Sequence, residues 1–204
     1  KFEIIDDLSQ REIYSVDAMI IDDQNRLWIA GDGGVAAYNI ETKDWQSYSS
    51  EVAIFDAYDF NALVKDAEGI IYIGSDDHGI FRYDGNSFTN HVIPGMPMFS
   101  GISRILPSPE GALWFVELWG SGVTKYSPDM ETWEIITYGD DNCCPIPYIW
   151  DEQERLWAGG DTGLWLIDSR VPTQWTEEDG LPSGEINAIL PDISKEVVYI
   201  GTDS

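Results

Sequence analysis

Residues 26–39 read Arg26-Leu-Trp-Ile-Ala-Gly-Asp-Gly-Gly-Val-Ala-Ala-Tyr-Asn39, and the same pattern of residue types returns four more times along the chain. The pattern is an apolar run around one aromatic residue, a turn rich in Asp and Gly, and a second apolar run. Spacing this regular indicates an internal repeat of one structural unit. The central aromatic residues lie 44, 42, 43 and 42 residues apart, at Trp28, Tyr72, Trp114, Trp157 and Tyr199.

Each repeat divides into short runs rich in β-branched and aromatic residues, separated by turns of hairpin length. In the first repeat these runs are 18–21, 27–30, 35–38 and 44–48. The continuous apolar run 18–21 predicts a strand buried on both faces. The repeats cover about 17–48, 60–92, 102–137, 146–176 and 186–204, and the last of them holds only two runs.

Two further columns of residues follow the same period. A glycine opens the third run of each of the first four repeats, where a tight hairpin favours a residue that tolerates positive φ. These glycines are Gly34, Gly79, Gly122 and Gly163. The fourth run of each of the first four repeats carries an aromatic residue, which precedes the central aromatic residue of the next repeat by a nearly constant distance. Phe2 stands at a similar distance before Trp28. The fourth-run aromatic residues are Trp45, Phe88, Trp133 and Trp175.

Four-stranded antiparallel units with a period of roughly 40–50 residues are typical of a β-propeller. The sequence therefore predicts an all-β fold, a β-propeller of four-stranded blades with about five repeats visible and the last incomplete. Residues 1–5 are expected to form a closing outer strand. Two alternatives stay open: a segment of a larger propeller, which we favour, or a five-bladed ring with a degenerate last blade. The open edge of the last repeat can also pair with a strand of another chain.

Charge limits the classes of partner. The chain has 37 acidic and 11 basic residues among 204, which gives a formal net charge of −26. This balance repels phosphate backbones and anionic lipid, so neither nucleic acid nor a membrane surface is expected as partner. No run of 18 apolar residues is present, and membrane insertion by this chain is not expected.

The only two cysteines, Cys143 and Cys144, are adjacent. Neighbouring Cα atoms lie about 3.8 Å apart, closer than ordinary disulfide geometry prefers. A strained vicinal disulfide, two free thiols and an intermolecular bridge all stay open.

One face of the predicted propeller carries acidic turns. The turns between the second and third strands, with the loops that join blades, should share one rim. A ring of carboxylates there would concentrate cations or bind a hard divalent cation such as Ca2+, although Asp is also an ordinary turn residue. The candidate metal ligands are Asp32, Asp76, Asp77, Glu117, Asp161 and Asp203. No calcium-loop consensus is present, so no cofactor is assigned with certainty.

The same rim is expected to carry the partner-binding residues. Apolar and aromatic residues on loops of a rigid scaffold indicate recognition, unless they fold inward and plug the channel. His78 lies beside two rim carboxylates and can act as a base or ligand, or stand exposed in a polar turn. The candidates for partner binding are Phe55, Tyr58, His78, Met96, Met98, Phe99 and Trp119.

The repeat resembles the two-component-regulator propeller repeat. Its pattern is present in Asp66-Ala-Glu-Gly69 with Ile71-Tyr-Ile-Gly-Ser75, in Leu156-Trp-Ala-Gly159, and in Trp175 with Asp179-Gly-Leu-Pro182. The resemblance covers nearly the whole chain. It implies a bacterial, periplasmic or extracellular protein, since such repeats build the sensing part of hybrid histidine kinases and also occur in secreted and surface proteins.

The sequence therefore favours a non-catalytic recognition, sensor or scaffold propeller that binds a protein or glycan outside the cytoplasm. A metal-assisted propeller lyase or hydrolase, and a structural subunit of a larger surface assembly, are the alternatives. No catalytic residue is assigned, because neither a Gly-x-Ser-x-Gly elbow nor a His-Glu-x-x-His pair occurs.

Overall fold

The structure is a computed structural model that describes residue 5 and residues 8–48, 59–91, 101–118, 122–138, 147–168 and 171–203. The helices among them are short 3-10 turns, namely η1 (Leu8–Arg11), η3 (Glu177–Asp179) and η4 (Ile193–Lys195). None of these has the length and apolar character needed to cross a membrane. The remaining regular structure is β-strand, so the predicted all-β class is confirmed.

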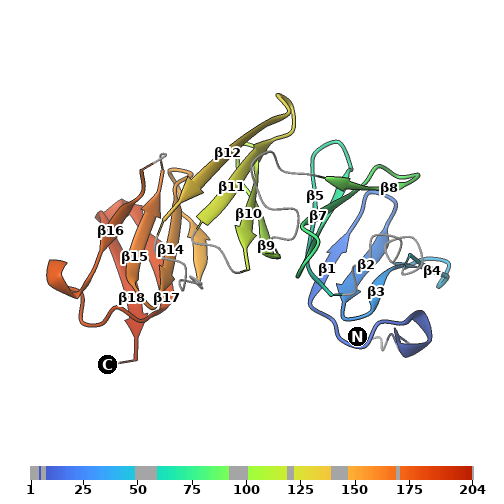
Figure 1. Ribbon diagram of the computed structural model, residues 1–204, viewed down its shortest axis with the longest axis horizontal. Helices are drawn as coiled ribbons and strands as arrows, with labels where there is room; N and C mark the ends of the chain where they lie inside the picture. The colour runs from blue at the N-terminus through green and yellow to red at the C-terminus, as the bar shows by residue number, and fades with distance from the viewer. Residues whose placement is uncertain are drawn as a thin grey trace. The chain divides into compact units, whose positions relative to one another are not determined.

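The chain divides into two compact units, residues 1–107 and residues 108–204. Unit 1, drawn from blue to green in Figure 1, holds two four-stranded antiparallel sheets whose strands lie in sequence order. The first sheet consists of β1 (Ala18–Ile21), β2 (Arg26–Gly31), β3 (Gly34–Asn39) and β4 (Trp45–Ser47). The second consists of β5 (Phe60–Lys65), β6 (Ile71–Ser75), β7 (Ile80–Tyr83) and β8 (Phe88–His91). Strand β9 (Ile102–Pro107) packs on β5 and β6.

Unit 2 repeats this arrangement (Figure 1). Its first strands, β10 (Leu113–Glu117), β11 (Gly122–Ser127) and β12 (Thr132–Thr137), pair antiparallel in sequence order. A four-stranded sheet follows, made of β13 (Tyr148–Trp150), β14 (Leu156–Gly160), β15 (Gly163–Ile167) and β16 (Thr173–Trp175). The last sheet has two strands, β17 (Ile186–Asp192) and β18 (Val197–Thr202). The predicted blade architecture, with an incomplete last repeat, is confirmed.

The repeated aromatic column forms the core, as expected for faces that one sheet cannot bury alone. Trp28, Tyr72, Trp114 and Trp157 expose between 0% and 6% of their surface. Tyr199 differs, because 52% of its surface is exposed. Within the described residues its strand, β18, pairs on one side only, with β17. Trp28 and Trp114 are covered by rings of the following sheet, Tyr83 and Trp150, and no described sheet follows β18.

Successive blades within a unit approach closely at a glycine that lies two residues after the aromatic column. A methyl group added to Gly74 would lie 2.8 Å from Ile102 Cγ2, and one added to Gly159 would lie 2.5 Å from Ile186 Cγ2. Real Cβ atoms almost never make such contacts. The isoleucine that opens the next blade thus occupies the space that a side chain at either glycine would need.

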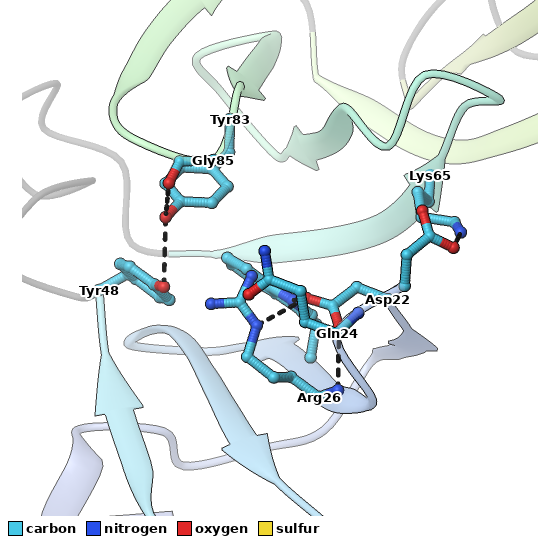
Figure 2. Close-up of polar contacts among 9 residues, drawn as sticks. Asp22, Gln24, Arg26, Tyr48, Lys65, Tyr83 and Gly85 are labelled. Carbon is cyan, nitrogen blue, oxygen red and sulfur yellow. Dashed lines mark hydrogen bonds and ion pairs between the residues drawn. The ribbon is translucent and has the colours of Figure 1, made fainter.

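In three repeats a buried carboxylate, at Asp22, Asp66 or Asp151, fixes the turn between the first and second strands. It is best seen at Asp22 (Figure 2). Its Oδ1 accepts hydrogen bonds from the backbone nitrogens of Gln24 and Arg26, both at 2.9 Å. Its Oδ2 accepts from Arg26 Nε at 2.7 Å and from Trp28 Nε1 at 2.8 Å. Although burial raises the pKa of Asp22, these hydrogen bonds outweigh it and hold the pKa below its ordinary value.

The same network recurs three repeats later. Asp151 Oδ1 accepts from the backbone nitrogens of Gln153 and Arg155 at 2.9 and 3.0 Å. Asp151 Oδ2 accepts from Arg155 Nε at 2.8 Å and from Trp157 Nε1 at 2.9 Å. The network thus joins the turn to the aromatic column of the same blade.

Two other repeats contain reduced versions of this network. Among the described residues, Asp66 accepts two backbone hydrogen bonds, from Glu68 at 3.1 Å and Ile70 at 2.8 Å, and Ile70 and Tyr72 replace the Arg and Trp. In the third repeat Ser108 replaces the carboxylate, and its Oγ accepts from the Ala112 nitrogen at 3.0 Å.

Two expectations are wrong in detail. Strand β1 is buried on one face only, since Met19 and Ile21 expose 59% and 57% of their surface. The reason is that, among the described residues, a neighbouring sheet covers β1 on one face only, where β5 packs. Of the four column glycines, Gly79 and Gly163 have positive φ, whereas Gly34 and Gly122 do not. A methyl group at Gly122 would lie 2.6 Å from the Ile136 carbonyl oxygen, so close approach explains this glycine instead.

Several expectations concern residues outside the described ranges. These are the closing strand over residues 1–4, Phe2 in the aromatic column, and the pairing of Cys143 and Cys144.

Candidate functional site

The acidic rim predicted from the sequence is most concentrated in unit 1. Asp32 lies in the β2–β3 turn, and Asp76 and Asp77 lie in the β6–β7 turn. The structure adds two carboxylates that the repeat pattern did not select, Asp17 just before β1 and Asp59 just before β5. We call these five residues the acidic rim cluster.

Backbone and side-chain hydrogen bonds fix the first half of this cluster. The Asp32 nitrogen donates to Ser15 Oγ at 2.9 Å, and Ser15 Oγ donates to Asp17 Oδ2 at 2.6 Å. The Tyr14 nitrogen donates to the Asp32 carbonyl oxygen at 2.8 Å. The segment before β1 is thereby held along the β2–β3 turn, which places two carboxylates on one edge of the blade.

The second half is held from β5. The Asp76 nitrogen donates to the Asp59 carbonyl oxygen at 3.1 Å, and Asn61 Nδ2 donates to Asp76 Oδ1. Asn61 can reach this turn because the pairing of β5 with β6 shifts register between Phe60 and Ala62, which leaves Asn61 as the extra residue of a bulge.

The last repeat contains the same bulge and the same hydrogen bond. The register of β17 against β18 shifts between Ile186 and Ala188, and Asn187 Nδ2 donates to Asp203 Oδ1 at 2.6 Å. Our sequence interpretation missed this pairing. The signal is present in the chain as Phe60-Asn-Ala-Leu63 and Ile186-Asn-Ala-Ile189.

Burial and, after it, repulsion between like charges shape the electrostatics of the cluster. Partial burial, a side-chain hydrogen bond with Asp32 and the charges of Asp32, Asp76 and Asp77 raise the pKa of Asp59 above its ordinary value. Burial and the charges of Asp77 and Asp17 likewise raise the pKa of Asp76. A raised pKa means that the folded protein destabilises the ionised carboxylate. A positive charge brought to this rim would relieve that destabilisation.

His78 is the basic side chain that lies against the cluster. Its Nδ1 is 2.6 Å from Asp77 Oδ1, and its backbone nitrogen donates to Ser75 Oγ at 3.0 Å. The imidazole is therefore oriented by a carboxylate on an otherwise acidic rim. An imidazole in such a position can share a proton with a bound partner.

The rim carboxylates of unit 2 are Glu117, Asp161 and Asp203. Burial raises the pKa of Glu117 above its ordinary value. Asp161 is exposed in the β14–β15 turn, and Asp203 is exposed after β18. Among the residues that the structure describes, no group of three or more His, Cys, Asp or Glu side chains is arranged to hold a metal ion. A Ca2+ site at the rim stays a prediction.

Most of the predicted partner-binding residues fall outside the described ranges. His78 is described, and the structure says nothing of Phe55, Tyr58, Met96, Met98, Phe99 and Trp119.

The comparisons with known proteins give structural relatives only. No family model matches the chain, and no curated protein matches it in sequence. Among solved structures, the extracellular domain of a protein assigned to a hybrid two-component system of B. thetaiotaomicron superimposes with a TM-score of 0.70 at 16% identity. That match covers 93% of this chain and 26% of the other.

Two other relatives have different roles. A surface component of the type-IX secretion system of Porphyromonas gingivalis matches with a TM-score of 0.64 at 17% identity, over 92% of this chain and 31% of the other. Virginiamycin B lyase from Staphylococcus aureus matches with a TM-score of 0.62 at 14% identity, over 89% of this chain and 61% of the other. The chain thus spans between about a quarter and three fifths of these relatives, and at such identity the likeness shows the fold alone.

Proposed function

We propose that this chain is a non-catalytic recognition domain that works outside the cytoplasm and binds a cationic group of its partner at the acidic rim cluster. Among the partners considered from the sequence, this favours a protein over a glycan. The observation that carries the proposal is the arrangement of the carboxylates: hydrogen bonds through Ser15 and from Asn61 hold the acidic rim cluster on one edge of two adjacent blades. The raised pKa of Asp59 and Asp76, caused by burial and by neighbouring carboxylates, supports it.

The chemistry of the rim supports a partner with Lys or Arg side chains, or a free divalent cation. Five carboxylates lie on one edge of two adjacent blades, and the chain as a whole carries a net charge of −26. Such a field accelerates encounter with cationic partners and weakens as salt is added. Two of the relatives are extracellular or surface proteins, which supports a location outside the cytoplasm. The lyase shares the fold alone, which supplies no argument for catalysis here.

The experiment compares the wild type with Asp59→Asn/Asp76→Asn. At pH 7 and low salt we expect CaCl2, and separately an oligolysine peptide, to raise the thermal midpoint of the wild type. We expect a clearly smaller rise in the double variant. Without added cation, the double variant should be more stable than the wild type by about 0.5–1 kcal/mol, the range for exposed charge pairs. Differential scanning calorimetry at constant ionic strength measures both effects.

The control is Asp44→Asn/Glu41→Gln, which removes two exposed acids from the β3–β4 turn and leaves the rim intact. We expect this variant to respond to both cations as the wild type does. Equal responses of all three proteins would mean that the cations act on net charge rather than at the rim, and the proposal would be abandoned.

A second mode of partner binding follows from the last sheet. We propose that a strand of another chain pairs with β18, whose exposed face includes Val197 and Tyr199. Exposed sheet edges recruit strands, and a charged side chain on the edge opposes this. We therefore expect the wild type to self-associate at high concentration and Tyr199→Lys to stay monomeric in analytical ultracentrifugation. Identical sedimentation of the two proteins would argue against strand pairing.

A further inference from the structure

In three of the four complete repeats, a ring from the end of the chain's fourth run packs on the central aromatic residue of the same blade. This ring belongs to the residue that lies opposite the one after the column glycine. The rings are Tyr48, His91 and Trp175, which lie 4.8, 5.8 and 5.7 Å from the ring centroids of Trp28, Tyr72 and Trp157. The third repeat has an aliphatic residue there instead, since Ile136 lies opposite Val123.

A second position of the repeat also carries a ring in three repeats and an isoleucine in one. It lies on the third strand, opposite the residue that precedes the central aromatic residue. Its occupants in chain order are Tyr38, Tyr83, Tyr126 and Ile167. The fourth repeat is therefore the one that lacks the tyrosine.

Between the first two sheets these two positions meet over the same indole (Figure 2). Tyr48 and Tyr83 lie 4.8 and 5.1 Å from the Trp28 ring, and their hydroxyls are 3.4 Å apart. The Tyr83 hydroxyl also donates to the Gly85 carbonyl oxygen at 2.9 Å. Two tyrosine rings thus fill this part of the interface between blades, and each phenolic hydroxyl has a polar neighbour.

The corresponding place between the third and fourth sheets holds a cavity of about 310 Å3. Trp114, Ile136 and Ile167 all line it. The two positions at which the repeat exchanges a ring for an isoleucine therefore come together at one cavity. Its volume is at the lower end of those of small-molecule sites, which suits a ligand with a single ring.

The rest of the lining is polar and mostly acidic. The carboxylates are Glu110, Glu134, Glu154 and Asp168, and the cationic side chains are Lys125 and Arg155. The Arg155 guanidinium already donates to Asp151, at 2.8 Å from Nε. An anionic ligand would therefore meet net repulsion, whereas a hydroxyl group would find acceptors.

We propose that this cavity binds a small neutral phenol, whose ring packs against Trp114, Ile136 and Ile167 where the other interface has tyrosine rings. Its hydroxyl donates to a carboxylate of the lining, as the Tyr83 hydroxyl donates to the Gly85 carbonyl. The cavity belongs to unit 2 and the acidic rim cluster to unit 1, so the site does not depend on the function proposed for the rim.

An NMR titration of the isoleucine methyl groups with p-cresol, the side chain of tyrosine as a free molecule, tests the site directly. A ring packed against Ile136 and Ile167 should shift their methyl signals upfield in a saturable manner. The methyl signals of Ile186, which is buried against Gly159, serve as the internal control and should stay in place. No saturable shift up to about 10 mM p-cresol, well above the millimolar Kd expected of so small a ligand, would overturn the proposal.

Three analogues test the chemistry of the ligand. Toluene lacks the hydroxyl, and 4-methylbenzoate keeps the ring but carries a negative charge. We expect each to bind at least about tenfold more weakly than p-cresol, and equal binding of either would contradict the assigned hydrogen bond or the repulsion. N-acetyl-L-tyrosinamide should also bind more weakly, because the space corresponds to side chains alone. Equal or tighter binding of this compound would assign the site to a tyrosine of a protein partner and overturn the proposal.

The second arm restores a ring from within the chain. Ile167→Tyr should lower p-cresol affinity at least about tenfold and leave the thermal midpoint at or above that of the wild type. Ile167→Val is the matched control and should bind p-cresol as the wild type does. Unchanged binding by folded Ile167→Tyr would contradict the assigned place of the ring. Ile136→Tyr, which restores the counterpart of Tyr48, gives the same test should Ile167→Tyr fail to fold.

Discussion

Asp22→Ala should lower the free energy of unfolding by about 3–5 kcal/mol, the range seen when one partner of a buried ion pair is removed. The side chain of Asp22 is 6% exposed and that of Arg26 is 17% exposed. Removing the carboxylate leaves the guanidinium, the Trp28 indole and two backbone N–H groups without their acceptor. Urea denaturation followed by tryptophan fluorescence measures the change.

Asp66→Ala is the matched control for this prediction. Asp66 occupies the same turn position and is similarly buried, at 8% exposure, yet among the described residues it accepts hydrogen bonds from two backbone N–H groups. We therefore expect a loss of only about 1–2 kcal/mol. Equal losses at Asp22 and Asp66 would show that the arginine and the indole contribute nothing beyond the turn itself.

The pH dependence of stability provides a second readout of the same network. The pKa of Asp22 and of Asp151 is lower in the folded protein than its ordinary value. Each carboxylate therefore contributes stability that is fully present above the unfolded pKa of about 3.9 and is lost as pH falls through the folded pKa. The rim residues Asp59 and Asp76 have raised pKa values and act in the opposite sense, because their destabilisation disappears on protonation.

Gly159→Val should destabilise the protein by forcing two neighbouring blades apart. Even a methyl group there would lie 2.5 Å from Ile186 Cγ2, 2.8 Å from Ile186 Cβ and 3.1 Å from Ile189 Cδ1. The last blade would have to move away from β14, and overpacking of this kind costs about 1–3 kcal/mol or more. Chemical denaturation of the variant measures the loss.

Gly201→Val provides the comparison, because Gly201 lies at the same position relative to Tyr199 as Gly159 does to Trp157. Among the described residues, a methyl group at Gly201 would meet Ala188 of its own sheet, with Cβ at 3.3 Å and the backbone nitrogen at 3.9 Å. We expect a change of less than about 1 kcal/mol, in line with a half-exposed strand position. A large loss at Gly201 would mean that valine harms this position through the strand backbone rather than through contact between blades.

The sequence predicted the fold from a single property, the recurrence of one aromatic residue every 42–44 positions. Burial of Trp28, Tyr72, Trp114 and Trp157 confirms the physical reason, since each ring fills the space between sheets. The faces of an edge strand were harder to predict. The run Ala18-Met-Ile-Ile21 is apolar throughout, yet only alternate side chains pack, because among the described residues a neighbouring blade covers β1 on one face only.

Only part of the candidate site could be predicted from the sequence, because some of its residues are placed by contacts between segments and not by their position in the repeat. The repeat pattern identified Asp32, Asp76 and Asp77, because it places each of them in the turn between the second and third strands of a blade. Asp17 and Asp59 each precede the first strand of a blade, β1 and β5. They join the cluster through hydrogen bonds between that segment and a turn of the rim, such as the one that the Asp76 nitrogen donates to the Asp59 carbonyl oxygen. The hydrogen bond from Asn61 to Asp76 depends on the bulge at Asn61, which shifts register by one residue and is not apparent from hydrophobic periodicity.

The most direct test of the account is an NMR titration of the side-chain carboxyl carbons of Asp59 and Asp76, with and without CaCl2. If like charges crowd this rim, both residues titrate above the ordinary aspartate value of about 3.9 and return toward it when the cation is added. Titration of both at or below that value, with no response to the cation, would contradict the proposal that the rim is built to receive positive charge.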